Sequence, residues 1–520
     1  MQWKERVAQG RTFAIISHPD AGKTTLTEKL LLFGGAIREA GAVKARKAQA
    51  HARSDWMEIE RQRGISVTST VLQFPYRGYR INLLDTPGHQ DFSEDTYRTL
   101  LAADSVVMVI DSAKGVEPQT IKLFEVCRLR KIPVFTFFNK LDRESREPWD
   151  LLDEVEHVLG IETYPMNWPV GMGLAFRGIF DRQHQTFERF DRNRQVLEQV
   201  PYRELTGIPD DQIHELEEAL ELLDGAGGRF DPAKVSAGEQ SPAFWGSAIA
   251  NFGVQSFLDY FIELAPPPLP RLSTDGYIEP EREIFTGFVF KIQANMNPSH
   301  RDRVAFLRIC SGQFERGMTV VHEPTGRTLR LSQPQQFLAE DRQIVDFAYP
   351  GDVIGLHDSG LFAIGDTLTN QPGVRFVGFP RFSPEHFAEI ELKYTLKHKQ
   401  YQRGIEELSE EGLLQVFRSP DLGPEIYLGV VGPLQFEVLQ YRLQHEYGVE
   451  VTLRRLSYTM ARWIVSDSLP DIGRFDHAKI VVDQTQRPVV LIEDQRTLER
   501  LQEKNPNLQL SEASATPLNY

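Results

Sequence analysis

The sequence is poor in cysteine, with only Cys127 and Cys310, which lie far apart in the chain. Two such residues suggest neither a disulfide framework nor a zinc site. Long apolar runs are also missing: the best, residues 106–110, lies between Asp104 and Asp111, whereas a membrane helix needs about 20 apolar residues. The first residues contain no apolar segment of the kind that a signal peptide carries. We therefore expect a cytoplasmic protein without a membrane partner.

Basic side chains are too few to coat nucleic acid. The chain has 58 lysines and arginines against 73 aspartates and glutamates, a formal net charge of −15. Binding without sequence preference needs clustered Lys and Arg, so we expect no free nucleic acid as a partner. One segment, residues 38–63, departs from this balance with seven basic and four acidic side chains. It fits either a contact with a ribonucleoprotein or a solvated loop, and the sequence leaves both open.

A length of 520 residues exceeds what one core usually supports, and the sequence divides into several regions. Residues 1–268 read as an α/β domain with an insertion at about 160–240, followed by a proline-rich linker. Residues 280–380 contain short strands separated by turns, which is typical of a small β-barrel. Residues 386–500 alternate strands and helices as an α+β, ferredoxin-like domain does. Residues 505–520 read as a polar tail that frays.

The first domain shows apolar strands separated by helices. We expect strands at 12–16, 80–85, 105–110 and 133–138 and helices at 24–33, 93–102 and 117–130. This alternation predicts a parallel sheet covered on both faces. Ligands of such sheets bind at the carboxyl ends of the strands, where the polar motifs of this chain lie.

The first motif is Ser-His-Pro-Asp-Ala-Gly-Lys-Thr at residues 17–24, between an apolar strand and a helix. This context suits a phosphate-binding loop, whose backbone N–H groups around Gly22 surround a β-phosphate. Lys23 would reach the β- and γ-phosphates, and the Thr24 hydroxyl would hold Mg²⁺. Ser17 replaces the glycine that usually opens the pattern, so an ordinary strand-to-helix turn is the alternative for this motif alone.

A second motif, Asp-Thr-Pro-Gly-His at residues 85–89, follows another strand. Asp85 at the strand end can hold Mg²⁺ through water, and the Gly88 N–H can touch a γ-phosphate. His89 then lies towards the place of an attacking water, which makes it the candidate catalytic residue. Ser66, in the segment 60–66, would complete the Mg²⁺ shell when the γ-phosphate is present.

The third motif, Asn-Lys-Leu-Asp at residues 139–142, selects the base. The Asp142 carboxylate can accept hydrogen bonds from the ring N–H and the exocyclic amine of guanine, whereas adenine has no such pair of donors. Asn139 would brace the loop and Lys140 would lie over the base. Ser247 and Ala248 could offer a backbone N–H to the guanine carbonyl oxygen.

Together with Arg-Gly-Ile-Ser at 63–66, these motifs resemble the signature set of the translational GTPases. Residues 280–380 also contain segments that resemble this family, at residues 287–292, 303–317, 351–355 and 364–368. The resemblance covers roughly residues 8–500 and is nearest to members that act in translation termination. It implies a multidomain protein: an α/β P-loop GTPase domain, a β-barrel second domain and an α+β ferredoxin-like C-terminal domain.

The resemblance further implies a ribosome-dependent GTPase that uses GTP/GDP and Mg²⁺ and promotes release of class I peptide chain release factors. The expected partners are the ribosome and those factors, and the expected state is a monomer. His89 would orient the water, Asp20 would support the phosphate loop, and Ile65 and Pro19 would screen His89. The positions that the resemblance assigns to GTP are Ser17, His18, Pro19, Asp20, Ala21, Gly22, Lys23, Thr24, Thr25, Asp85, Thr86, Pro87, Gly88, His89, Asn139, Lys140, Leu141, Asp142, Ser247 and Ala248; those assigned to the metal are Thr24, Ser66 and Asp85.

Three other functions are open to a chain of this kind. A translocase or ribosome-protection GTPase is the nearest alternative, which the end of the chain near residue 500 disfavours. A nucleotide-controlled binding module would have little use for His89. A P-loop kinase or ATPase would not need the guanine-selective motif at 139–142. The chain contains no Gly-Gly-Gln tripeptide, so it does not resemble the factors that hydrolyse peptidyl-tRNA.

Overall fold

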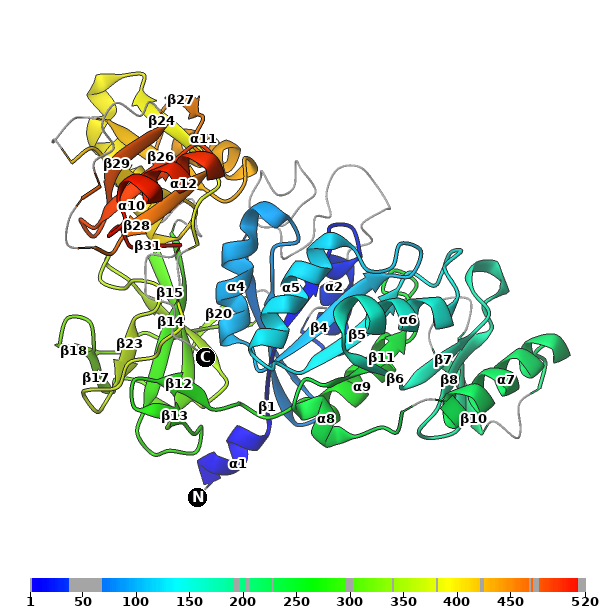
Figure 1. The fold of residues 1–520 in the computed structure, drawn as a ribbon. Helices are drawn as coiled ribbons and strands as arrows, with labels where there is room; N and C mark the ends of the chain where they lie inside the picture. Colours follow the sequence, from blue (N-terminus) through cyan, green and yellow to red (C-terminus); the bar gives the residue numbers. More distant parts are fainter. Residues whose placement is uncertain are drawn as a thin grey trace.

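The computed structural model describes residues 2–36, 68–190, 196–201, 206–226, 228–294, 303–338, 341–379, 382–420, 425–466, 469–470 and 477–512. The basic segment 38–63 and Ser66 lie outside these residues. Within them, no helix is long and apolar enough to cross a membrane. The chain forms an α/β unit, then a β unit, then an α+β unit (Figure 1).

The α/β unit contains a central sheet with the strand order β3-β1-β4-β5-β11-β6, all parallel. Phe13 and Ile15 of β1 pack with helices α2 and α9, while Ala14 and Ile16 pack with helices α4, α5 and α6. Successive side chains of a strand point to opposite faces, so helices on both faces bury the strands completely. These elements are β1 (Gly10–Ser17), β3 (Tyr79–Asp85), β4 (Ser105–Asp111), β5 (Val134–Asn139), β6 (Glu162–Pro165), β11 (Gln240–Trp245), α2 (Lys23–Phe33), α4 (Ser93–Ala102), α5 (Pro118–Leu129), α6 (Pro148–Leu159) and α9 (Val254–Leu264).

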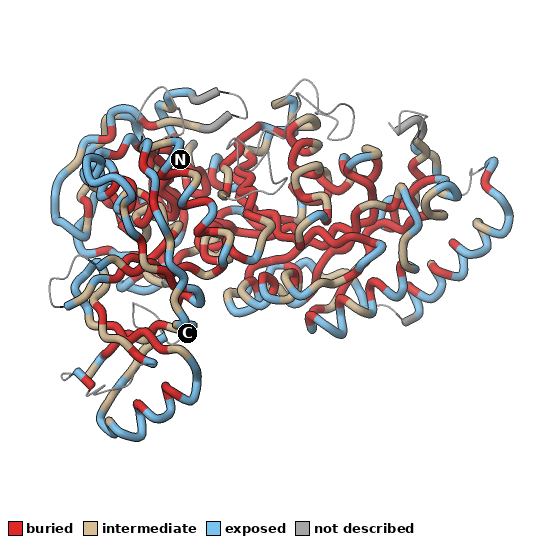
Figure 2. Tube along the Cα trace, turned by 90° about the horizontal axis from the view of Figure 1, so that it is seen from above, coloured by how far each residue is buried: buried red, intermediate tan, exposed pale blue. Residues whose placement is uncertain are grey.

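Burial follows this layering. Figure 2 shows buried residues concentrated along the strands, while the helices that cover them alternate between buried and exposed positions. A buried Val134–Asn139 strand and a half-exposed α5 are what a helix-covered parallel sheet requires.

The sheet is not wholly parallel, and here the expectation is wrong. Strand β2 (Thr70–Tyr76) lies beside β3 and runs antiparallel to it. A two-residue turn joins the two strands, and both of its residues, Arg77 (φ 44°) and Gly78 (φ 86°), have positive φ. Such turns match the twist of a hairpin. The glycine at residue 78 therefore indicated a hairpin turn, but the alternation of strands and helices around it favoured a parallel sheet.

The insertion divides between two sheets. Its first strand, β6, extends the central sheet, so the inserted region does not stand apart as a whole. Further on, a separate four-stranded antiparallel sheet is covered by a helix at residues 210–226. These elements are β7 (Asn167–Val170), β8 (Gly178–Asp181), β9 (Thr186–Phe190), β10 (Val196–Pro201) and α7 (Asp210–Ala226).

The β unit is antiparallel and surrounds one apolar core that includes Val289, Leu307 and Ile354. Strand β19 also pairs with β2 of the α/β unit at Leu338 and Gln73, so the two units share one 15-stranded sheet. The longer strands of this unit are β14 (Thr286–Ala294), β15 (Arg303–Ser311), β17 (Thr319–His322), β18 (Arg327–Arg330), β19 (Gln335–Leu338), β20 (Asp341–Ile344), β22 (Val353–His357) and β23 (Thr367–Thr369).

A buried ionic network fixes the β unit to the α/β unit. Asp104 is fully buried and accepts hydrogen bonds from Arg271 (2.7 Å) and Arg308. Arg308 also donates to the Thr12 hydroxyl at 2.8 Å. Burial lowers the pKa of Arg271 to about 10, although the charge of Asp104 opposes that shift. Because all three groups are removed from water and Asp104 is the carboxylate that pairs with both arginines, loss of Asp104 would leave two buried cations without it.

The C-terminal unit begins with strands in the order β27-β24-β26-β25 and two helices, which is the antiparallel ferredoxin-like arrangement expected. Four more strands and a helix extend its sheet. The elements are β24 (His386–Leu392), α10 (His398–Glu410), β25 (Gln415–Arg418), β26 (Ile426–Val430), α11 (Leu434–His445), β27 (Val451–Leu456), β28 (Met460–Ile464), β29 (Ala478–Asp483), β30 (Pro488–Ile492), α12 (Gln495–Lys504) and β31 (Leu510–Ser511).

One expectation for the C-terminus is wrong. Residues 510–511 of the predicted fraying tail form strand β31, which pairs with β28 at Trp463 and Ile464. Leu508 and Leu510 pack on the apolar cluster under α12. Burial of these two side chains stabilises an ordered conformation even though the neighbouring residues are polar. Residues 513–520 lie outside the described part of the chain.

Candidate nucleotide-binding site

The phosphate loop joins β1 to α2 in a very tight turn. Asp20 (φ 67°) and Gly22 (φ 97°) both adopt left-handed backbone conformations. A Cβ atom on Gly22 would lie 2.3 Å from Asn139 Nδ2, so only glycine fits. The first N–H groups of α2, at Lys23, Thr24 and Thr25, have no acceptor within the helix and lie at its positive end. The loop can therefore bind an anion.

Two strand ends meet beside this loop. Lys23 forms an ion pair with Asp85, and both side chains are buried. Thr86 donates a hydrogen bond to the Ile15 carbonyl oxygen at 2.6 Å, which ties the end of β3 to β1. Ser17 is buried, and its hydroxyl has no hydrogen-bond partner among the described residues. The loop thus combines a cation, a carboxylate and an unsatisfied hydroxyl.

Asn139 connects three loops. Its Nδ2 donates to the Ala21 carbonyl oxygen at 2.8 Å, and its Oδ1 accepts the Ala248 N–H at 2.9 Å. The Ser247 hydroxyl donates to the Asp142 carboxylate. One buried amide therefore holds the phosphate loop, the 139–142 loop and the 247–248 loop in a fixed relation, and Leu141 is buried beneath them.

Lys140 closes one side of the site. It adopts φ 75°, and its Nζ donates to the Asp20 carbonyl oxygen and to Asp111 Oδ2 (2.8 Å). Both contacts hold the ammonium group in place, so the aliphatic part of the chain is fixed beside the Asp142 loop.

Asp111 is a residue that the sequence reasoning missed. It is fully buried at the end of β4 and also accepts hydrogen bonds from Arg143 (2.9 Å) and the Ala113 N–H (3.0 Å). Burial by itself would raise the pKa of Asp111, but these donors and the positive charges outweigh it and lower the pKa. The available signal was an aspartate at a strand end, the same signal that identified Asp85.

His18 lies against the start of α5. Its Nε2 pairs with the Glu117 carboxylate and lies 3.4 Å from Lys114 Nζ. Burial lowers the pKa of His18, with the charge of Glu117 opposing the change. The imidazole is thus held by α5 while the His18 backbone remains part of the phosphate loop.

The 85–89 loop passes next to the phosphate loop. A Cβ on Gly88 would lie 3.9 Å from Pro19 Cα and 4.0 Å from Lys23 Cε, which places Gly88 beside both. His89 is 32% exposed, and its Nδ1 accepts the Asp91 N–H at 3.3 Å. Ser66 and Ile65 lie outside the described residues.

The structure thus brings residues 17–25, 85–89, 139–142 and 247–248 to the carboxyl edge of one sheet. Comparison with known families gives this edge its context. The model "Elongation factor Tu GTP binding domain" matches residues 8–267, and "Elongation factor G domain 2" matches residues 284–371. The model "Class II release factor RF3, C-terminal domain" matches residues 376–502.

Curated relatives agree over the full length. "Peptide chain release factor 3" of Symbiobacterium thermophilum is 58% identical over 517 residues, which cover 97% of each chain. The chain belongs to the peptide chain release factor 3 family. The member from Cyanothece sp. is 54% identical over 516 residues, which cover 97% of this chain and 95% of the relative.

A solved structure supports the fold. A crystal structure of a protein from Thermus thermophilus matches with a TM-score of 0.71 at 25% identity, covering 86% of this chain and 67% of the other. The predicted translational GTPase family and the predicted multidomain fold class are confirmed by these matches. As a member of this family the chain binds GTP and is a GTPase, so the kinase and ATPase alternatives are excluded.

Proposed function

We propose that this protein is a ribosome-dependent GTPase that promotes departure of class I, codon-reading release factors after the nascent chain has been freed. The observation that carries the proposal is the joining of the phosphate, 139–142 and 247–248 loops through Asn139, in a chain whose C-terminal unit is of the release factor 3 type. The same C-terminal match over residues 376–502 disfavours the translocase and ribosome-protection alternative.

For guanine, the proposed reader is Asp142. Its carboxylate is half-buried and oriented by the Ser247 hydroxyl, so it can accept both N–H groups of the base edge. Asn139 supports this reader from behind, and Lys140 covers the base with its aliphatic chain. The Ala248 N–H already donates to Asn139 Oδ1, so a bond to the guanine carbonyl oxygen would have to be shared or come from a neighbouring N–H.

For the phosphates, residues 17–25 provide N–H donors and the Lys23 ammonium group. The oxygen donors present are those that Mg²⁺ prefers: the Asp85 carboxylate and the Thr24 hydroxyl, with the Ser66 hydroxyl proposed from the sequence. Among the described residues there is no group of three or more His, Cys, Asp or Glu side chains that could hold a metal ion. Mg²⁺, when bound, would neutralise charge on the β- and γ-phosphates.

For hydrolysis, the proposed catalytic residue is His89. Its side chain is partly exposed, and the Asp91 N–H on Nδ1 leaves Nε2 to carry the proton in the neutral ring. Such a ring can orient a water towards a γ-phosphate beside Gly88. We expect slow hydrolysis until the ribosome holds His89 in that position.

We further propose a monomer that works in the cytoplasm, where bacterial ribosomes translate. The proposed units are residues 1–268 with an insertion near 160–240, residues 280–380, and residues 386–500. The β31 pairing supports moving the end of the third unit to about residue 512.

The test uses a fluorescent class I release factor bound to ribosomes that have released their peptide. Addition of this protein with GTP is expected to accelerate departure of the labelled factor, and GDP is expected not to. Accelerated movement of mRNA through the ribosome, with no effect on the factor, would support the translocase alternative and overturn the proposal.

A further inference from the structure

Asp91 lies between the candidate catalytic histidine and the C-terminal unit. It belongs to the short helix η1 (Gln90–Phe92), directly after the 85–89 loop, and is 4% exposed. A buried carboxylate needs partners. The partners of this carboxylate come from both sides of the boundary between the units.

On one side Asp91 contacts His89. Its backbone N–H donates to His89 Nδ1 at 3.3 Å, and its Oδ1 lies 3.2 Å from the same nitrogen. The N–H suits the neutral ring, in which Nδ1 is an acceptor. The carboxylate suits the imidazolium, in which Nδ1 carries a proton. Asp91 therefore contacts the Nδ1 side of the ring with both its backbone and its side chain.

On the other side Asp91 contacts the start of α11. Its Oδ2 accepts the Leu434 N–H at 2.7 Å. The first N–H groups of a helix have no partner inside the helix, and a carboxylate there is favoured by the helix dipole. The contact thus satisfies a buried acceptor and an orphan donor at once.

Gly432 leaves space for this carboxylate. A Cβ atom at residue 432 would lie 2.1 Å from Asp91 Cγ and 2.4 Å from Oδ1. Gly432 does not have a positive φ, so its backbone would accept alanine. What excludes a side chain at this position is the Asp91 carboxyl group.

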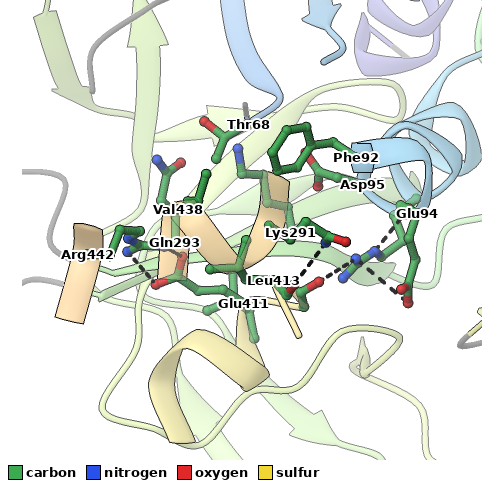
Figure 3. Close-up of a pocket in the computed structure, with 14 residues that line it drawn as sticks. Thr68, Phe92, Glu94, Asp95, Lys291, Gln293, Glu411, Leu413, Val438 and Arg442 are labelled. Carbon is green, nitrogen blue, oxygen red and sulfur yellow. Dashed lines mark hydrogen bonds and ion pairs between the residues drawn. The ribbon is translucent and has the colours of Figure 1, made fainter. Parts of the chain in front are cut away.

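The surrounding contacts fix the two units together at this point. Phe92 and Val438 form one buried apolar cluster with Leu434. Arg98 of α4 donates to the Gly412 carbonyl oxygen at 3.2 Å. Figure 3 shows the pocket where these parts meet, with Phe92 and Glu94 from the α/β unit, Lys291 from the β unit, and Glu411 and Val438 from the C-terminal unit.

We propose that Asp91 is a positioning residue for His89 and that the C-terminal unit sets its orientation through the Leu434 N–H and Gly432. The proposal rests on the catalytic role proposed for His89. It makes the orientation of the catalytic ring depend on docking of the C-terminal unit, so a displacement of that unit would alter hydrolysis without touching the nucleotide.

The first test compares Asp91→Ala and Asp91→Asn in ribosome-stimulated GTP turnover. Asp91→Ala is expected to lower kcat by about 10- to 100-fold, because misplacing a reacting group by about 1 Å costs up to that much. The Kd for GTP should be unchanged. Asp91→Asn keeps the shape and an acceptor for the Leu434 N–H, so it should retain most of kcat. Wild-type kcat in Asp91→Ala would overturn the proposal.

A double-mutant cycle asks whether Asp91 acts through His89. In a His89→Ala background, Asp91→Ala should have no further effect on turnover; the same fold-loss in both backgrounds would overturn the positioning role. The two proposals fail differently. Unchanged turnover in His89→Ala alone refutes the proposed catalytic role, whereas normal turnover in Asp91→Ala beside an inactive His89→Ala refutes only the positioning.

The part played by the C-terminal unit is tested from its own side with Gly432→Ala. The new methyl group should displace the Asp91 carboxyl group and lower kcat, with GTP affinity kept and with little additional effect in an Asp91→Ala background. Gly225→Ala is the matched control, because a Cβ there meets no described atom within 4 Å and φ is not positive. Wild-type kcat in a folded Gly432→Ala protein would contradict the inference.

Discussion

In the proposed nucleotide site, single residues would decide which base is accepted. Asp142 is held by Ser247, and Asn139 is held by two loops at 2.8 and 2.9 Å. Their motif could be recognised in the sequence because its residues are consecutive and follow an apolar strand.

The roles of Asp111 and Asp91 could not be predicted from a motif. Their roles depend on partners that the fold brings close: Lys140 for Asp111, and Leu434 of a distant unit for Asp91.

Replacement of Asp142 by asparagine should change the base preference. The variant exchanges an acceptor for a donor opposite the guanine ring N–H, so GTP affinity should fall about 100-fold, corresponding to ~3 kcal/mol. Xanthine, which has a carbonyl in place of the exocyclic amine, should bind the variant better than the wild type. Equilibrium titration with fluorescent nucleotides measures both. Unchanged GTP affinity would show that Asp142 does not read the base.

Glu188 should make stability depend on pH. It is buried in β9, and burial first, then the charges of Asp181 and Asp259, raises its pKa to about 7. Between the ordinary glutamate pKa and about 7, the folded protein keeps a proton that the unfolded chain has lost. Stability from this group therefore falls as pH rises through that window.

Glu188→Gln should remove this penalty. The variant is expected to be more stable than the wild type by up to ~3 kcal/mol at about pH 8, and to lose this advantage near pH 4. Chemical denaturation at the two pH values measures the difference. The control is Glu221→Gln, at an exposed position of α7. An equal effect at both pH values would contradict the assignment to Glu188.

At the scale of elements, local pattern predicted most helices and strands but not all pairings. Residues 93–102 were expected as a helix and form α4 with the same bounds. The antiparallel hairpin of β2 and β3 was missed because the preceding and following segments read as parallel α/β. Strand β31 was missed because two residues carry no periodicity, and only packing on β28 makes them a strand.

The turn between β1 and α2 gives a test at this scale. In Gly22→Ala the methyl group would lie 2.3 Å from Asn139 Nδ2, so the brace between the phosphate and base loops should break. Nucleotide binding should be lost, beyond the ~1 kcal/mol cost of a left-handed alanine. Gly35→Ala is the matched control, because φ is 67° there and no described atom lies within 4 Å. If Gly22→Ala and Gly35→Ala lowered nucleotide affinity equally, the contact between the residue 22 methyl group and Asn139 would not be the cause of the loss.

At the scale of the molecule, the units are joined by groups that only the fold makes neighbours. Gln73 of β2 and Leu338 of β19 join the strands of two units into one sheet, and Asp104 pairs with Arg271 and Arg308 of the neighbouring unit. No sequence motif predicts these contacts, because the segments around these residues carry no pattern that identifies their distant partners. Domain composition could be predicted from sequence, but the way the units dock could not.

Loss of Asp104 should therefore destabilise the junction strongly. Asp104→Ala leaves two buried arginines unpaired, and breaking such a pair typically costs about 3–5 kcal/mol. Thermal unfolding should show a lower midpoint. Asp346→Ala, which removes an exposed partner of Arg316, is the control and should change stability by less than about 1 kcal/mol. Similar small effects in both variants would contradict the role of the network.

The central claim is that this guanine-nucleotide site hydrolyses GTP in response to the ribosome. The most direct measurement is GTP turnover by the wild type and by His89→Ala, each with and without post-release ribosomes that carry a class I release factor. We predict that ribosomes accelerate the wild type strongly, that His89→Ala binds GTP but loses about 100-fold or more of that turnover, and that equimolar ATP does not compete. GTP turnover that does not change when ribosomes are added, or that an equal concentration of ATP suppresses, would contradict a ribosome-dependent GTPase.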